Sequence, residues 1–465
     1  MDNVFDIVSR INEYLSDYIL VILLFSTGVF FTVRTGFVQV RCFAEGWKNA
    51  FGRLSFRTRN EPGTVSPFQA LSTAVAAQVG TGNIVGASGA ILAGGPGAIF
   101  WMWIIAFFSM ATIYAEAVLA QKTRITDPDG TLHGGPVYYI KTAFPNVIGK
   151  VLAGLFAVAV IAALGFMGGM VQANSIGETC STAFGIPAWV IGGIIAICSG
   201  LVFLGGVSRL AKVTEKLVPV MALLYITGGF LVLLFRIEYL PETFALIFKY
   251  AFAPDALLGG TFGHALKTAI SLGVKRGLFS NEAGMGSTPH AHAAASVPTP
   301  HVQGTIAMIG VFVDTAIVLT MTALIIISTI YTGDGVLANA AGGNYQQMVA
   351  DAQLTQTNLV QHAIASVTTP DFGNVFIAVC LIFFAYSTIL SWNYFGKINV
   401  VWLFGKKAAF VYLPLTVICI FLGTTLKSDL VWALQDMLNQ LMVLPNVLAL
   451  FALSGIAIAS AKAKK

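Results

Sequence analysis

Apolar runs about as long as a bilayer is thick recur along this chain from Tyr18 to its end. A helix needs roughly 20 such residues to cross the hydrocarbon core of a membrane. Of the 465 residues, 56% are apolar and only 10% are charged, whereas about 25% of the residues of a soluble domain are charged. A chain of this composition cannot cover itself with polar side chains, and we therefore expect it to be surrounded by lipid.

About eleven apolar segments predict an all-α membrane protein. The first segment follows acidic residues such as Asp6 and Asp17 rather than a basic cluster, and we therefore expect a permanent helix instead of a cleaved signal peptide. The segments, numbered in chain order, centre on residues 14–34, 66–93, 98–123, 151–180, 187–206, 212–236, 261–295, 301–330, 371–396, 408–426 and 429–460.

Lys and Arg gather in alternate connections between the segments, and this distribution predicts the orientation of the chain. The other connections hold few cations, so the positive-inside tendency places the N-terminus outside and the C-terminus in the cytoplasm, in the inner membrane of a prokaryotic cell. The basic connections and the tail contain Arg34, Arg41, Lys48, Arg53, Arg57 and Arg59 (connection 1/2), Lys122, Arg124, Lys141 and Lys150 (3/4), Arg209, Lys212 and Lys216 (5/6), Lys397, Lys406 and Lys407 (9/10), and Lys462, Lys464 and Lys465.

Segments 2 and 7 each contain a run of glycine and polar residues at membrane depth. The runs span residues 76–86 (AAQVGTGNIVG) and 273–287 (GVKRGLFSNEAGMGS). Unwinding a helix in lipid frees N–H and C=O groups that cost several kcal/mol each when unpaired, so such breaks occur where they line a polar cavity. The runs predict two discontinuous helices with a ligand site between them. For segment 2 alone, close helix packing at Gly82 and Gly86 is an alternative.

The two predicted breaks occupy matching positions. Segments 2 to 6 form one block of five and segments 7 to 11 another, and because five is odd the second block is inserted upside down relative to the first. We expect a single transmembrane domain over residues 1–465, with an extra helix and connection at 1–65, a first repeat at 66–236 and an inverted repeat at 261–460. Freed N–H groups suit an amino-acid carboxylate, and freed carbonyls suit Na⁺ or an ammonium group.

At these runs the sequence resembles the alanine or glycine:cation symporter family, whose members have the leucine-transporter-type fold. The resemblance covers nearly the whole chain. Its motifs are residues 79–84 (VGTGNI), 94–103 (GGPGAIFWMW), 170–175 (MVQANS) and, most specifically, 277–287 (GLFSNEAGMGS). The resemblance implies a sodium-coupled symporter that imports a small neutral amino acid, alanine and/or glycine with glutamine as a further candidate, by alternating access.

The resemblance also implies which residues form the site. The first break would hold the substrate carboxylate, and the second break would frame the amino group and side chain. Two hydroxyls of segment 9 would bind Na⁺ together with main-chain carbonyls of segment 2. The expected substrate residues are Gly80, Thr81, Gly82, Asn83, Gln172, Phe279, Ser280, Asn281 and Trp392, and the expected sodium residues are Ala76, Val79, Ser387 and Thr388.

Four of these residues can instead have a purely structural role. Ser387 and Thr388 can donate to carbonyls of their own helix. Gln172 can bridge two helices instead of contacting a ligand. Trp392, near the end of segment 9, can belong to an aromatic belt at the membrane interface.

Three acidic residues, Glu116, Glu282 and Asp314, lie at membrane depth and need partners there. We expect a structural role, for instance with Glu282 capping a helix end or pairing beside the nearby Arg276. A proton relay through them would instead give a proton-coupled amino-acid carrier. An ion channel is a more distant alternative, because a channel tends to repeat its filter across subunits, whereas here both breaks lie within one chain.

No enzymatic, cofactor or nucleic-acid function is expected. The five cysteines have no C-x-x-C spacing, and no G-x-x-x-x-G-K-[ST] phosphate loop occurs. His290, His292 and His301 near Ser287 are compatible with a metal cluster or a hydrolase. We expect neither, and no transition-metal site, because histidine at a helix end is ordinary. The expected partners are a small amino acid, Na⁺ as the coupling ion and the lipid bilayer, without an obligatory protein partner.

Overall fold

The computed structural model describes residues 2–52, 64–126, 132–259, 261–341, 343–426 and 428–463. These residues are mostly helical, and one antiparallel pair, β1 (Ile125–Thr126) and β2 (Leu132–His133), lies in the connection after α7. Part of the predicted orientation depends on residues outside the described ranges, namely Arg53, Arg57, Arg59, Lys464 and Lys465.

The helices follow the predicted apolar segments in chain order. Up to the end of the predicted first repeat they are α1 (Asp2–Tyr14), η1 (Leu15–Leu20), α2 (Val21–Arg34), α3 (Val38–Arg41), α4 (Phe43–Phe51), α5 (Pro67–Gln78), η3 (Gly82–Gly86), α6 (Ala87–Gly94), α7 (Ala98–Thr123), α8 (Pro136–Ala143), α9 (Val147–Val160), η4 (Ile161–Gly168), α10 (Gly169–Phe184), α11 (Ala188–Phe203) and α12 (Gly206–Phe235).

The second half continues in the same way. It contains η5 (Ile237–Tyr239), α13 (Leu240–Phe252), α14 (Asp255–Leu258), α15 (Phe262–Asn281), α16 (Pro289–Ala293), α17 (Pro300–Val311), η6 (Phe312–Leu319), α18 (Thr320–Ile330), α19 (Tyr345–Asp351), α20 (Leu359–Ala365), α21 (Pro370–Phe404), η7 (Lys406–Ala408), α22 (Ala409–Gly423), α23 (Ser428–Ala452) and α24 (Ser454–Lys462).

The all-α membrane class is confirmed, whereas the number of eleven spans stays a prediction. Among the described residues six helical stretches are long and apolar enough to cross a membrane, and two bent helix pairs raise the number to eight. α2 and α11 are shorter apolar helices. α15 falls outside this set, and it carries Lys267, Lys275 and Arg276.

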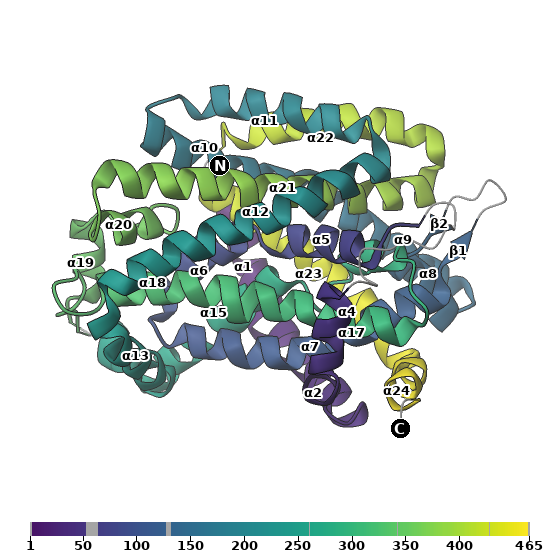
Figure 1. The fold of residues 1–465 in the computed structure, drawn as a ribbon, viewed down its shortest axis with the longest axis horizontal. Helices are drawn as coiled ribbons and strands as arrows, with labels where there is room; N and C mark the ends of the chain where they lie inside the picture. The colour runs from purple at the N-terminus through teal and green to yellow at the C-terminus, as the bar shows by residue number, and fades with distance from the viewer. Residues whose placement is uncertain are drawn as a thin grey trace.

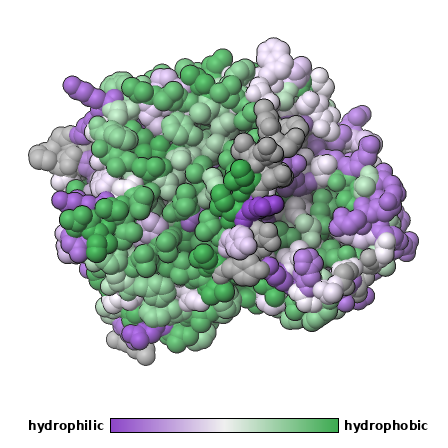
Figure 2. All heavy atoms as spheres, turned by 180° about the vertical axis from the view of Figure 1, so that it is seen from behind, coloured by the Kyte–Doolittle hydropathy of each residue, from purple (hydrophilic) through white to green (hydrophobic). Residues whose placement is uncertain are grey.

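The outer surface matches a lipid environment. The face in Figure 2 is broadly hydrophobic between hydrophilic residues at its two sides. Over the whole molecule, large apolar side chains are strongly exposed, for example those of Phe410 at 81%, Leu223 at 70% and Phe235 at 69%. A soluble monomer rarely exposes large apolar patches, so these residues indicate contact with lipid.

The core is built around two long helices, α7 and α21. α7 packs against α2, α15 and α17, and α21 packs against α5, α10 and α20. In Figure 1 α7 and α21 run across the picture, with α13, α19 and α20 at one end of the molecule and α8 with the β1–β2 pair at the other. The breaks themselves, residues 79–86 and 281–287, are buried inside the bundle.

Candidate functional site

The first break lies between α5 and η3, as predicted, with a bend of 45°. Side chains hold two of its backbone N–H groups. Gly80 N donates to Asn83 Oδ1 at 3.1 Å, and Thr81 N donates to Gln172 Oε1 at 3.2 Å. A Cβ on Gly80 would lie 2.4 Å from Oγ1 of Thr388, so only glycine allows α21 to approach the break so closely.

The second break follows α15 and is shorter than the predicted run, because residues 273–281 stay helical. Glu282 ends α15 with a φ of +58°, and Gly284 and Gly286 have φ values of +85° and +78°. A non-glycine residue with positive φ is uncommon, and such conformations cluster at functional sites. The carboxylate of Glu116 in α7 accepts from the N–H groups of Gly284 and Gly286, at 3.1 Å each.

Close packing explains some glycines of the predicted runs but not all. A Cβ on Gly273 or Gly277 would lie 2.5 Å or 2.8 Å from atoms of α7, so these two glycines allow α15 to pack against α7. At Gly86 the nearest atom would be 3.9 Å away, which is ordinary contact. At Gly82 a Cβ would lie 3.2 Å from the backbone of Ser280 in α15. The packing alternative therefore accounts for Gly82 but not for Gly86 in segment 2.

Asp314 of η6 joins the two breaks. Its carboxylate accepts from Asn83 Nδ2 of the first break at 2.6 Å and from Ser280 Oγ at the end of α15 at 2.9 and 3.0 Å. The neighbouring Thr315 hydroxyl donates to it at 2.8 Å. Asp314 therefore has the structural partners expected of it, and these are uncharged hydrogen-bond donors from both discontinuous helices.

Glu282 does not pair with Arg276, so that part of the interpretation is wrong, but Glu282 does occupy the C-terminal cap position of α15. Glu282 accepts from Ser287 Oγ at 2.6 Å and from the indole N–H of Trp392. Arg276 is turned away from the break and donates to Asp436 of α23 at 3.2 Å. The physical reason is the αL conformation at residue 282, which directs the chain away from the helix that carries Arg276.

The expected substrate residues come together in the interior. Gln172 contacts the first break through Thr81, and Phe279 packs edge-to-face on Trp392 with ring centroids 6.1 Å apart. Trp392 is only 2% exposed, so it does not lie in an interfacial belt. All nine residues are buried, namely Gly80, Thr81, Gly82, Asn83, Gln172, Phe279, Ser280, Asn281 and Trp392.

Buried polar groups at both breaks are unpaired. Within the described residues these include the hydroxyl of Thr81, the side-chain NH₂ of Asn281 and the side-chain oxygen of Gln78. Such groups are rare in folded proteins, and a bound molecule is one common reason for them. The backbone carbonyl of Asn281 is satisfied, because it accepts from Gln78 Nε2 at 2.8 Å and thereby ties the two breaks together.

The expected sodium residues lie where α21 crosses the end of α5. Thr388 Oγ1 is 2.8 Å from the carbonyl oxygen of Ala76, and Ser387 Oγ is 3.5 Å from it. Both hydroxyls also contact the carbonyl of Phe384 in their own helix, at 3.1 Å and 2.8 Å. Each hydroxyl therefore makes the local hydrogen bond of the structural alternative and also lies beside the carbonyl of Ala76, while Na⁺ binding by these groups stays a prediction. Val79 follows the last residue of α5, where carbonyls lack helical partners.

Several residues of the site were missed in the sequence. Asn446 of α23 donates to Glu116 at 2.6 Å and to the carbonyl of Gly284 at 2.9 Å, and it accepts from the hydroxyl of Tyr139. Asp436, also in α23, is the partner of Arg276. Polar residues inside apolar segment 11 were the available signal, because they are costly in lipid without a function.

An aromatic and ionic stack lies beside Phe279. Arg276 sits over the ring of Trp432 at 5.0 Å, and Trp432 packs on Phe279 with centroids 5.2 Å apart. Lys275 adds a second contact to Asp436 at 3.5 Å. A cavity of about 50 Å³ adjoins Phe279, and one of about 300 Å³ adjoins the ionic groups. Both cavities are large enough for water-sized molecules.

The histidines after the second break do not form one centre. The two ring nitrogens of His290 contact the carbonyl of Ser287 and the side chain of Asn399, whereas His292 contacts a glutamine. The hydroxyl of Ser287 donates to Glu282 and not to a histidine. A hydrolase arrangement of serine and histidine is therefore absent from these described residues.

Comparison with known proteins assigns the chain to a family. The profile of the sodium:alanine symporter family matches residues 1–464. "Sodium/alanine symporter AgcS" of Methanococcus maripaludis is 39% identical over 459 residues, which cover 98% of this chain and 96% of that protein. "Probable sodium/glutamine symporter GlnT" of Bacillus subtilis is 38% identical over 98% of this chain and 90% of its own length.

The fold has a solved counterpart. The crystal structure of MhsT in complex with L-phenylalanine superposes with a TM-score of 0.61 at 14% identity, covering 86% of this chain and 96% of that chain. This likeness confirms the predicted leucine-transporter-type architecture. The whole-length profile and the relatives show more than the fold: the chain belongs to the sodium:alanine symporter family and is a multi-pass amino-acid symporter.

Proposed function

We propose that the protein imports alanine or glycine, with glutamine as a further candidate substrate, together with Na⁺ by alternating access. One observation carries this proposal. Among the described residues, the buried Thr81 hydroxyl in the first predicted run and the buried Asn281 NH₂ in the second have no hydrogen-bond partner. Leaving such a buried donor unsatisfied costs about 1–3 kcal/mol. A ligand with a carboxylate accepts from both and removes that cost.

The aromatic residues favour a small substrate. Phe279 and Trp392 meet edge-to-face beside the breaks, and a Cβ on Gly168 would lie 2.3 Å from the ring of Trp392. A Cβ on Gly82 would lie 3.2 Å from the ring of Phe279. Little room remains around these rings for a large side chain, which agrees with alanine or glycine.

Na⁺ is the coupling ion in this proposal. Hydroxyls of Ser387 and Thr388 and carbonyls of Ala76 and Val79 are hard oxygen ligands without a carboxylate, which suits a monovalent cation that must also leave. Na⁺ between α5 and α21 would fix the first break and so raise substrate affinity by linkage. A membrane potential adds roughly 2.3 kcal/mol per charge per 100 mV.

The ionic stack of Arg276, Asp436 and Trp432 serves as the outer closure. In the predicted topology α15 enters from outside, so these residues lie on the outer side of Phe279. Separation of α15 from α23 would open this path, and movement of one repeat against the other would open the inner path. In this proposal the two repeats span residues 66–236 and 261–460, the N-terminus lies outside, and the protein resides in a prokaryotic inner membrane.

Proton coupling is the second candidate, because Glu116, Glu282 and Asp314 are buried carboxylates close to both breaks. The two ions are separated by uptake of labelled amino acids into proteoliposomes under a sodium gradient or a proton gradient alone. We expect saturable uptake of alanine and glycine only with the sodium gradient. Uptake driven by protons without Na⁺ would reject sodium coupling, and uptake that does not saturate would indicate a channel.

The sodium residues have a matched test. Thr388→Ala removes a hydroxyl that contacts Ala76, and we expect it to raise the Na⁺ concentration for half-maximal uptake more than it lowers expression. Thr425→Ala is the control, since that exposed hydroxyl, just after the end of α22, donates at 2.8 Å to the carbonyl of Leu422 in that helix. Equal sodium dependence in both variants would refute the assignment.

Gln172 is tested through substrate choice. Gln172→Ala removes the acceptor for Thr81 N, and we expect a changed order of amino-acid competitors in the uptake assay. An unchanged competition profile would mean that Gln172 only bridges helices.

A further inference from the structure

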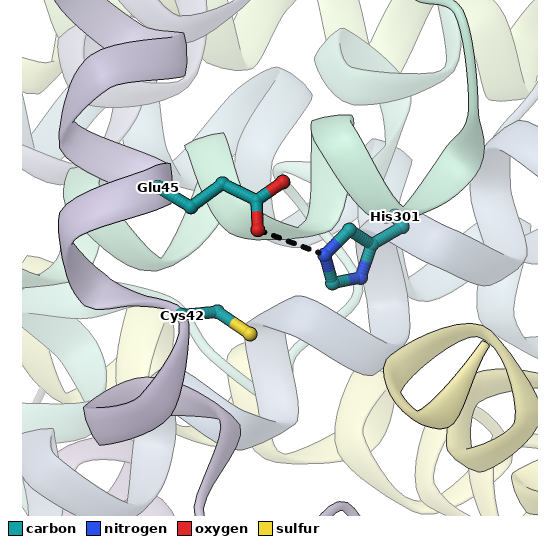
Figure 3. Close-up of side chains that lie close together, drawn as sticks. All are labelled: Cys42, Glu45 and His301. Carbon is teal, nitrogen blue, oxygen red and sulfur yellow. Dashed lines mark ion pairs between the residues drawn. The ribbon is translucent and has the colours of Figure 1, made fainter. Parts of the chain in front are cut away.

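Three potential metal ligands converge where α4 contacts α17. Cys42 lies at the bend between α3 and α4, Glu45 lies in the first turn of α4, and His301 is the second residue of α17. One ligand atom from each residue lies within 4.8 Å of those of the other two. In Figure 3 the thiol, the carboxylate and the imidazole ring point toward a common space.

The distances approach those of a tetrahedral centre. Zinc bonds of about 2.0–2.3 Å to nitrogen, oxygen and sulfur place neighbouring ligand atoms roughly 3.3–3.6 Å apart. Glu45 Oε2 and His301 Nε2 are 3.6 Å apart. From the limit of 4.8 Å, the thiol needs a shift of about 1.2–1.5 Å at most to reach the same spacing, which a side-chain rotation supplies.

A hydrogen bond at its other nitrogen orients the ring of His301, as is usual for histidines that bind a metal. Its Nδ1 lies 2.7 Å from the hydroxyl of Tyr114, a residue of α7 that is fully buried. With the Nδ1 proton donated to Tyr114, the lone pair of Nε2 faces Glu45. A second partner of this sort fixes the tautomer and the direction of the ligating nitrogen.

The burial of the three ligands fits a centre with an open position. Cys42 and His301 are each 6% exposed, whereas the side chain of Glu45 is 26% exposed. Solvent can therefore reach the carboxylate edge and supply a fourth, water ligand. The nearby Arg41 is held away by its bonds to the carbonyls of Thr35 and Ala461, at 3.2 and 2.8 Å.

We propose that Cys42, Glu45 and His301 bind one divalent transition-metal ion, with Zn²⁺ as the ion whose ligand preferences they match. On binding, the thiol releases its proton and coordinates as thiolate. In the predicted topology the site faces the reducing cytoplasm, where thiols stay reduced. Because α17 also packs on α5 and α7, the ion would fasten the N-terminal connection to helices beside the first break.

The test is metal binding by the purified full-length protein after chelator treatment. Titration with Co²⁺ should give one equivalent of binding and a near-ultraviolet thiolate-to-cobalt band that Zn²⁺ displaces. Cys42→Ser should abolish the band, and Glu45→Gln and Tyr114→Phe should weaken Co²⁺ binding about tenfold or more. Tyr114→Phe leaves all three ligands in place and so tests the positioning role separately.

Matched controls are Cys198→Ser and His264→Gln, both at exposed positions, which should leave band and affinity unchanged. Should Cys42→Ser fail to give a monodisperse protein, the affinity of Glu45→Gln decides, because that residue is partly exposed. Absence of a thiolate band in the unaltered protein, its persistence in Cys42→Ser, or unchanged binding by Glu45→Gln would overturn the proposal. None of these readouts depends on transport.

Discussion

Glu116→Gln tests whether a buried carboxylate of α7 holds the second break in shape. In the native protein each carboxylate oxygen accepts from one backbone N–H, that of Gly284 or that of Gly286, at 3.1 Å. Glutamine has nearly the same shape but offers one carbonyl oxygen and one NH₂. One of the two backbone N–H groups must then face another donor, and backbone N–H groups cannot turn away as hydroxyls can.

The expected effect follows from that single lost acceptor. An unsatisfied buried donor costs about 1–3 kcal/mol, which corresponds to about a 5- to 150-fold increase in the equilibrium constant for opening the break. Hydrogen exchange measured by mass spectrometry on peptides that contain residues 283–287 should show this increase. The exchange of α21, which lies on the other side of the site, should change much less.

Glu242→Gln is the matched control, since Glu242 is exposed in the first turn of α13 and the charge change is the same. It should leave the exchange of residues 283–287 unchanged. If Glu116→Gln shows native exchange in that segment, the carboxylate does not hold the break and the reasoning fails. The test is independent of the transported substrate and the ion.

Three further predictions concern other contacts. Gly80→Ala should abolish uptake while the protein still reaches the membrane, because its Cβ would lie 2.4 Å from Oγ1 of Thr388; normal uptake would contradict this. Trp392→Phe keeps an aromatic ring but removes the indole donor to the buried carboxylate of the second break, so the KM for uptake should rise about fivefold or more. Arg236 lowers the pKa of Asp334, so the loss of thermal stability in Asp334→Asn should be small, present at neutral pH, and absent once the pH falls through that lowered pKa.

The two breaks were predictable because glycine and polar residues in the middle of an apolar helix have few other uses in lipid. The extent of the second break was not, because two kinds of glycine look alike in a sequence. Gly273 and Gly277 allow α15 to pack on α7, whereas Gly284 and Gly286 provide the positive φ angles of the break. Only the neighbouring helix distinguishes these roles.

The partners of buried acids were the least predictable part. Glu116 receives donors from residues 168, 170 and 330 positions away, and no local pattern encodes such distances. Their closeness in the sequence suggested Arg276 as the partner of Glu282. In the structure Arg276 instead pairs with Asp436, and Glu282 accepts a hydrogen bond from Ser287. Partners of charged residues are therefore hard to predict across a helix end, because side chains before and after that end point in different directions.

The pattern of buried charge bears on the choice of coupling ion. In the described residues Glu116, Glu282 and Asp314 are bonded to neutral donors, while Lys275 and Arg276 are engaged by an aspartate of α23. Neutral donors stabilise a carboxylate without cancelling its field, whereas a paired cation would do both. Any of these carboxylates that is ionised would therefore leave a negative potential around the two breaks, and in the proposed function Na⁺ would neutralise it without a permanent positive side chain.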